Sequence, residues 1–259
     1  ELVAAAFGEA PPRNGRIDIN VKRRAMASWL RENTPETSGF IDASLAPEYG
    51  VLARWGEGHF IKYTGRRPSV MGNFGDDLGR EHFLLARSYF EAAPERASEI
   101  LETLRVRYVV IRSAYESRPM ARALFDRDGS RLGRYRLLHE VAPLSGTEVP
   151  SYKIFEFVKG AQLEGSAAPR SLVRVELRRV SNLGRSVRFE MVTEADRSGR
   201  YRVRLPYATA SGGIGAQGGT LDLGDDGSEY LVSSGGEVRR VAIEEASVQN
   251  GDVVSGPNF

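Results

Sequence analysis

The residues best suited to binding chemistry follow one another in the segment from Tyr49 to Ile61. An apolar run, typical of a buried strand, leads there into the sequence Trp55-Gly56-Glu57-Gly58-His59. Glycines at a strand end let the backbone approach a ligand closely, and ligands of α/β sheets bind at such ends. Trp55 offers an apolar wall and Glu57 a hydrogen-bond acceptor. We therefore predict a binding loop, and the alternative is a tight turn anchored by a buried Trp.

Two other patterns resemble binding motifs but lack the required context. The glycine spacing at residues 213–218 matches GxGxxG, yet it runs into a strand-like segment and not into the helix that a dinucleotide site needs. We interpret it as a flexible loop. The three histidines, His59, His82 and His139, have no metal-ligand spacing. The acids near turns complete no EF-hand; they are Asp76, Asp77, Asp222, Asp225 and Asp226. These patterns predict no metal site in this chain.

The composition is that of an ordinary globular protein. The 259 residues are 41% hydrophobic, with 36 basic and 34 acidic side chains. This apolar fraction excludes disorder, and the net charge of +2 gives no overall field that would favour nucleic acid. The absence of Cys excludes disulfides and thiolate-bound metals. A membrane-spanning helix needs about 20 consecutive apolar residues, and the sequence contains no such run.

The fold class that we predict is α+β, with a change of character near residue 150. Residues 21–150 alternate between helical and strand-like patterns and predict a mixed α/β layered domain. The clearest helix begins at Pro94 and carries the apolar stripe Ala97, Ile100, Leu101 and Leu104, and the apolar run Tyr108–Ile111 follows it directly.

Residues 151–259 show alternating apolar and polar positions in place of helical spacing. Val173, Val175 and Leu177 alternate with charged residues, and the segments around Phe189 and Val203 do the same. Strands that each have one solvent-exposed face and are separated by turns predict an antiparallel β-sandwich. The strand Lys153–Val158 is expected to link the two domains.

Short motifs along most of the chain resemble the C-terminal part of the oligosaccharyltransferase catalytic subunit of prokaryotes. They occur in the family's order between Val21 and Tyr207, so the resemblance rests on their succession. The motifs are Trp29–Pro35, Pro47–Val51, Trp55–His59, Arg67–Pro68, Asn73–Gly75, Tyr108–Ile111, Lys153–Ala161 and Asn182–Arg185.

This resemblance implies a glycosyltransferase that moves a glycan from a polyprenyl-diphosphate carrier to the Asn of an Asn-x-Ser/Thr acceptor polypeptide. In the family, membrane spans precede this part, and their external loops carry the catalytic carboxylates and a divalent metal, Mn²⁺ or Mg²⁺. The resemblance therefore implies that residues 1–20 are a segment that follows a membrane region. The chain is thus expected to be an extracytoplasmic domain at the cell membrane, periplasmic in a Gram-negative cell. It would hold no catalytic residue, bind no nucleic acid and be inactive alone.

The resemblance also implies which residues recognise the acceptor. The family's Trp-Trp-Asp-Tyr-Gly motif, which holds the acceptor's Ser/Thr hydroxyl, falls on residues 54–58. Only two positions match, and Gly56 replaces the Asp that accepts the hydrogen bond. Glu57 would substitute if the loop shifts; otherwise the acceptor preference has changed. We predict acceptor-binding residues Trp55, Gly56, Glu57, Gly58 and His59, with Met120 as the match to a second helper motif.

Two rival functions stay open from the sequence. One is a non-catalytic module that binds glycan or protein, with the β-rich half as its recognition surface. The other is a related membrane glycosyltransferase that uses a lipid-linked donor on a different acceptor. Membrane spans encoded directly upstream of Glu1 would favour an enzyme over the binding module.

Overall fold

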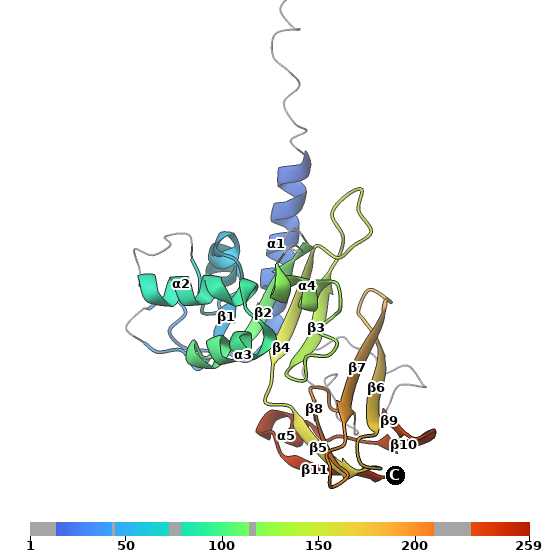
Figure 1. Cartoon of the computed structure of the whole chain (residues 1–259). Coiled ribbons are helices and arrows are strands. Elements are labelled where there is room, and N and C mark those ends of the chain that lie inside the picture. Colours follow the sequence, from blue (N-terminus) through green and yellow to red (C-terminus); the bar gives the residue numbers. More distant parts are fainter. Residues whose placement is uncertain (1–13, 43–44, 73–78, 114–117, 210–228) are drawn as a thin grey trace, which may run out of the picture.

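The computed structural model has the predicted α+β fold and describes residues 14–42, 45–72, 79–113, 118–209 and 229–259 (Figure 1). The glycine-rich residues 213–218 and the acids Asp76, Asp77, Asp222, Asp225 and Asp226 lie outside these ranges. Within them, no helix has the length and apolar character needed to cross a membrane. The 20-residue helix α1, Asn14–Asn33, is long enough, but it is rich in charged side chains.

A four-stranded sheet forms the core of the first half, in the order β1-β2-β4-β3. β1 and β2 are parallel, and β4 pairs antiparallel with both β2 and β3. Every residue of β4 is buried, as expected for a central strand covered on both faces. The strand predicted to link the domains therefore belongs to the first sheet, and it lies beyond the boundary predicted at residue 151. The strands are β1 Gly50–Leu52, β2 Val106–Arg112, β3 Tyr135–Val141 and β4 Tyr152–Phe157.

Short helices pack around this sheet. The predicted helix at Pro94 is α3, and its apolar stripe is buried at Ala97, Ile100 and Leu101. Proline at its first turn suits the fixed φ of that position. Arg105, at φ +52°, reverses the chain directly into β2. The helical segments around the sheet are α2 Arg80–Ser88, the 3₁₀ turn η4 Tyr89–Glu91, α3 Pro94–Thr103 and α4 Pro119–Phe125.

The long helix α1 packs on the sheet through its second half. Met26 and Leu30 are fully buried, and the Trp29 ring stacks on His139 of β3 with centroids 4.8 Å apart. Beyond the helix end, the buried Arg67 guanidinium donates to the carbonyl oxygens of Arg31 and Thr34. These orphan carbonyls at a helix C-terminus need such a donor. α1 is thereby held firmly against β3 and the loop after β1.

His139 makes stability depend on pH. Burial lowers the pKa of its imidazole to about 4, although the nearby charge of Glu140 opposes the shift. Between the ordinary value near 6.5 and about 4, only the unfolded chain binds this proton, so the free energy of unfolding decreases as the pH falls. The expected loss at pH 5 is at most about 2 kcal/mol. Urea unfolding at pH 7.5 and pH 5 measures it, and an equal loss in a His139→Phe variant would contradict the assignment.

The second half is built from two further sheets, in the orders β10-β9-β6-β7 and β11-β5-β8. The alternation predicted from the sequence is seen in β6, where Val173, Val175 and Leu177 are buried between more exposed residues. β11 pairs parallel with β5, so this half is not purely antiparallel. The elements are β5 Ala161–Ser166, β6 Leu172–Val180, β7 Ser186–Glu194, β8 Arg200–Leu205, β9 Tyr230–Ser234, β10 Glu237–Val241, α5 Glu245–Asn250 and β11 Val253–Asn258.

The helix α5 was not expected, because six residues are too few to show helical periodicity. It lies against the first sheet through a buried ion network. Arg136 of β3, with 3% of its side chain exposed, pairs with Glu156 of β4 at 2.6 Å and with Glu245 of α5 at 2.8 Å. This contact joins the two halves at one end of the sheet.

Candidate functional site

The predicted binding loop lies at one edge of the first sheet. Because β1 and β2 are parallel, their carboxyl ends meet at the same edge, which is where open α/β sheets bind ligands. The 3₁₀ turn η1, Trp55–Glu57, and the π-helical turn η2, Phe60–Thr64, follow β1 there. In Figure 1 these turns lie above β1, toward the end at which α1 begins.

The outer side of this loop exposes aromatic side chains. Trp55 is 50% exposed and Tyr63 is 65% exposed, which contradicts the alternative of a turn anchored by a buried Trp. The His59 and Tyr63 rings lie 6.0 Å apart, tilted by 32°. A Cβ added to Gly56 would meet no atom within 4 Å. Trp55 is therefore accessible, and the adjacent Gly56 position has free space around it.

Glu57, by contrast, points into the protein. Its side chain is only 2% exposed, and the Arg23 Nε of α1 donates to its Oε2 at 2.8 Å. The Arg112 Nη1, at the end of β2, lies 4.0 Å from its other oxygen. The expectation that Glu57 replaces the family's Asp disagrees with this geometry, because its carboxylate is buried against arginines and not beside Trp55.

The charge of Glu57 acts on its neighbours. Burial raises the pKa of the Tyr152 hydroxyl at the start of β4, and the Glu57 carboxylate raises it further. Burial disfavours the charged Arg23, but its hydrogen bond and charge interaction with Glu57 outweigh this and raise its pKa. Arg23, Arg112 and Tyr152 come from three distant segments, so no local spacing in the sequence could have indicated them.

Gly58 closes the loop by close backbone packing. A Cβ at this position would lie 2.4 Å from the Met71 carbonyl oxygen and 3.0 Å from the Gly72 Cα. Ser69 Oγ donates to the same carbonyl at 2.7 Å, which holds the segment that carries it in place. Gly58 is therefore required by the structure of the loop, whereas Gly56 is not.

Met120 lies on α4 and is 1% exposed. The helix packs against β2 and η4, so this side chain is part of the core. The structure does not bring Met120 to the surface that exposes Trp55. Its predicted role as a helper residue has no support from its position.

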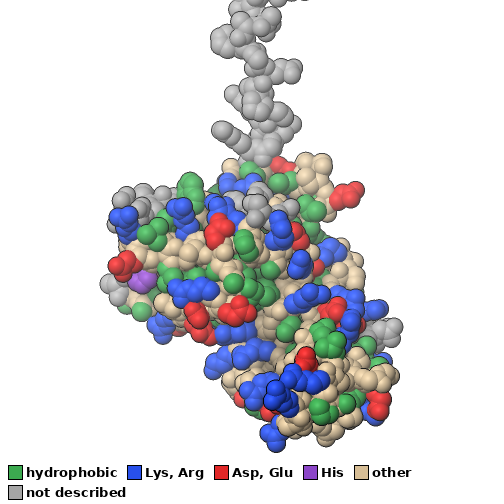
Figure 2. Space-filling view, in the orientation of Figure 1, with side chains coloured by type: hydrophobic (Ala, Val, Ile, Leu, Met, Phe, Trp, Pro, Cys, Tyr) green, Lys and Arg blue, Asp and Glu red, His purple; other side chains and the backbone are tan. Residues whose placement is uncertain are grey.

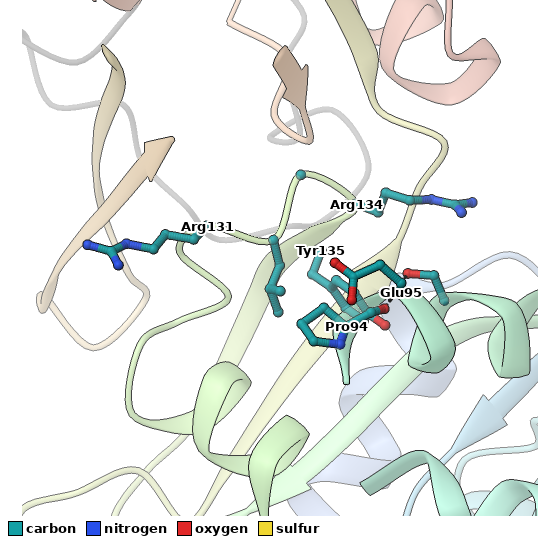
Figure 3. Close-up of a pocket in the computed structure, with 8 residues that line it drawn as sticks. Pro94, Glu95, Arg131, Arg134 and Tyr135 are labelled. Carbon is teal, nitrogen blue, oxygen red and sulfur yellow. Dashed lines mark hydrogen bonds between the residues drawn. The ribbon is translucent and has the colours of Figure 1, made fainter. Parts of the chain in front are cut away.

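Two cavities lie away from the Trp55 side chain. One, of about 160 Å³, lies beside the start of α3 (Figure 3). Pro94, Glu95 and Tyr135 gather there, whereas the side chains of Arg131 and Arg134 point away from one another. The other, of about 340 Å³, lies at the amino end of β1 and includes His82 and Arg105 in its lining. Both are separate from the predicted loop.

The described ranges show neither a metal-ligand cluster nor, on the face in Figure 2, a surface of a single charge. No group of three or more His, Asp or Glu side chains there is placed to hold a metal ion. The face in Figure 2 carries Lys and Arg over both parts of the molecule, with Asp and Glu among them. Cross-strand pairs such as Arg188–Glu176 at 2.6 Å account for part of this mixture.

Comparisons with known families match two parts of the chain. Residues 21–115 match the AglB core domain, and residues 160–254 match the long peripheral domain of archaeal glycosylation protein B. The second match begins just after β4, in agreement with the place of that strand in the first sheet. Dolichyl-phosphooligosaccharide-protein glycotransferase 2 of Archaeoglobus fulgidus is 31% identical over 97 residues, 36% of this chain and 15% of that protein.

Solved structures show the same fold over most of the chain. The apo form of the A. fulgidus oligosaccharyltransferase superposes with a TM-score of 0.73 at 19% identity, over 96% of this chain and 43% of that one. Its form tethered to an acceptor peptide containing the NVT sequon gives 0.71 at 19% identity, over 90% and 43%. The chain thus spans less than half the length of these relatives.

The fold agrees with the two family matches, which are both to domains of archaeal glycosylation protein B. The matched regions together make up more than half of the chain. The chain belongs to the AglB family.

Proposed function

We propose that the protein containing this chain is an oligosaccharyltransferase, and that this chain contributes acceptor recognition. The protein would transfer a glycan from a polyprenyl-diphosphate carrier to Asn in Asn-x-Ser/Thr acceptors. The observation that carries the proposal is the half-exposed Trp55 at the carboxyl edge of β1, within the region matched by the AglB core domain. A solved relative with an acceptor peptide tethered to it supports a peptide partner.

The exposed loop suits an extended peptide. Glycan transfer requires the acceptor Asn to be held at the reacting centre, and correct positioning supplies a large part of the rate. Trp55 provides an apolar wall, and the open space beside Gly56 admits an acceptor side chain. The Glu57 carboxylate already accepts a hydrogen bond from Arg23. Residues 55–58 would therefore offer the acceptor hydroxyl no free side-chain carboxylate. The acceptor preference of this protein is therefore expected to depend on packing against Trp55.

The rest of the reaction would take place outside this chain. A membrane portion would anchor the protein at the extracytoplasmic face and bind the lipid-linked glycan. It would also supply the catalytic carboxylates and their Mn²⁺ or Mg²⁺. A relative solved with dolichol-phosphate and an inhibitory peptide supports a lipid-linked donor. The chain alone would be inactive.

Replacing Trp55 by Ala tests this function. In the protein that contains the chain, supplied with its lipid-linked glycan, we expect kcat/KM for an Asn-x-Thr peptide to fall about tenfold. The free energy of unfolding should change by less than about 0.5 kcal/mol, because the side chain is half exposed. Leu84→Ala, at another exposed apolar residue, is the matched control. Unchanged peptide glycosylation in Trp55→Ala would refute the role of the loop.

A further inference from the structure

We infer that Arg23 and Glu57 are positioning residues: the ion pair between them, in which Glu57 is buried and Arg23 partly exposed, sets the orientation of the Trp55 side chain from helix α1. The consequence for acceptor binding rests on the proposed function; the geometric part does not. Trp55 and Glu57 are the first and last residues of the same 3₁₀ turn, so they move as one unit. One points outward and the other inward, with 50% and 1% of the residue exposed.

The inner end of this turn is fixed by charge. A buried carboxylate is costly unless it is paired and hydrogen-bonded, and Glu57 receives both from the Arg23 Nε at 2.8 Å. The Glu57 amide also donates to the Arg54 carbonyl oxygen at 2.9 Å, which closes the turn. Glu57 therefore has one stable position, and that position decides where Trp55 projects.

Arg23 connects α1 to both turns of the loop. Its guanidinium lies 5.6 Å from the centre of the Phe60 ring in η2, and its Nη1 donates to Asn20 Oδ1 at 3.1 Å on α1. On the far side of Glu57, Arg112 of β2 lies within 4.0 Å. The charge of Glu57 also reaches Tyr152 of β4. The pair is thus enclosed by α1, the loop and the ends of two strands, and a movement of α1 would be passed to Trp55.

Fluorine NMR on this chain, labelled with 5-fluorotryptophan, tests the geometric part. The sequence contains two Trp residues, and Trp55→Phe assigns their signals. We expect Glu57→Gln and Arg23→Ala each to shift or broaden the Trp55 signal. The Trp29 signal, from a buried ring stacked on His139, should stay unchanged and so report an intact fold. Arg170→Ala, which removes an exposed pair with Glu194, should alter neither signal.

An unchanged Trp55 signal in both variants would overturn the inference. A change in the Trp29 signal of Glu57→Gln would show that this variant has lost its fold. The Arg23→Ala variant then provides the test, because the Arg23 side chain is partly exposed and its removal disturbs the core less. In that variant, a shifted Trp55 signal beside an unchanged Trp29 supports positioning. A Trp55 signal identical to that of the parent refutes it.

Peptide glycosylation by the full protein separates the inference from the proposed function. If both hold, Arg23→Ala raises the KM for the acceptor peptide about tenfold and leaves kcat within about twofold, and Arg23→Lys restores part of the KM. A shifted Trp55 signal with an unchanged KM would leave the positioning pair in place and refute acceptor binding by Trp55. An altered KM with an unmoved Trp55 signal would refute the positioning pair alone.

Discussion

Replacing Lys153 by Met is expected to lower the free energy of unfolding by about 3–5 kcal/mol, the cost of removing one partner from a buried ion pair. The Lys153 side chain on β4 is 5% exposed. Its Nζ donates to Asp128 Oδ1 at 2.6 Å and lies 3.6 Å from Glu140 Oε1. The Glu140 side chain is fully buried. Without the ammonium group, two buried carboxylates share a single cation.

That remaining cation is Arg185, from the turn between β6 and β7. It contacts both Asp128 and Glu140 at 2.6 Å. Next to it, the Asn182 side chain accepts a hydrogen bond from the Glu140 amide and donates one to the Glu140 carbonyl oxygen, each at 2.8 Å. Lys153 therefore stabilises the sheet and the contact between the two halves together.

Urea unfolding of Lys153→Met at neutral pH measures this loss. Lys159→Met is the matched control, because Lys159 is exposed only two residues beyond β4. Its free energy of unfolding should stay within about 0.5 kcal/mol of the parent. An equal effect of the two substitutions would show that the buried network contributes little.

Replacing Gly58 by Ala is expected to lower the free energy of unfolding by about 2–3 kcal/mol through overpacking. The added Cβ would lie 2.4 Å from a backbone carbonyl oxygen, which cannot move aside as a flexible side chain can. The segment that carries this carbonyl is hydrogen-bonded to β1, where the Val70 amide donates to the Val51 carbonyl oxygen at 3.0 Å. Relief of the clash would therefore displace the Trp55 loop from the sheet edge.

Gly56→Ala is the matched control for this prediction, because it adds the same atom two residues earlier in open space. Thermal unfolding of both variants, with the Trp55 fluorescence of each folded form, makes the comparison. We expect a change below about 0.5 kcal/mol for Gly56→Ala. Equal stability of the two variants would show that the loop adapts to a Cβ at Gly58.

The sequence was sufficient to predict those helices and strands whose local pattern agrees with their burial in the structure. The stripe in α3, with its period of 3.6 residues, and the continuous apolar run of β2 predicted a helix followed by a buried strand. The alternation of apolar and polar residues in β6 predicted a strand with one solvent-exposed face. The sheet to which β4 belongs could not be predicted, for a related reason. A central strand such as β4 is apolar or ion-paired throughout, and nothing in its own sequence tells which sheet it joins.

For the site, the sequence predicted a binding loop and the presence of Trp55 and two glycines in it. It could not show that Glu57 turns inward, because Arg23, Arg112 and Tyr152 meet it only after α1, β2 and β4 have packed. It also could not distinguish Gly56, which has open space, from Gly58, which touches backbone. Local types and spacing set the elements and the loop, while the direction of each side chain depends on partners far away in the chain.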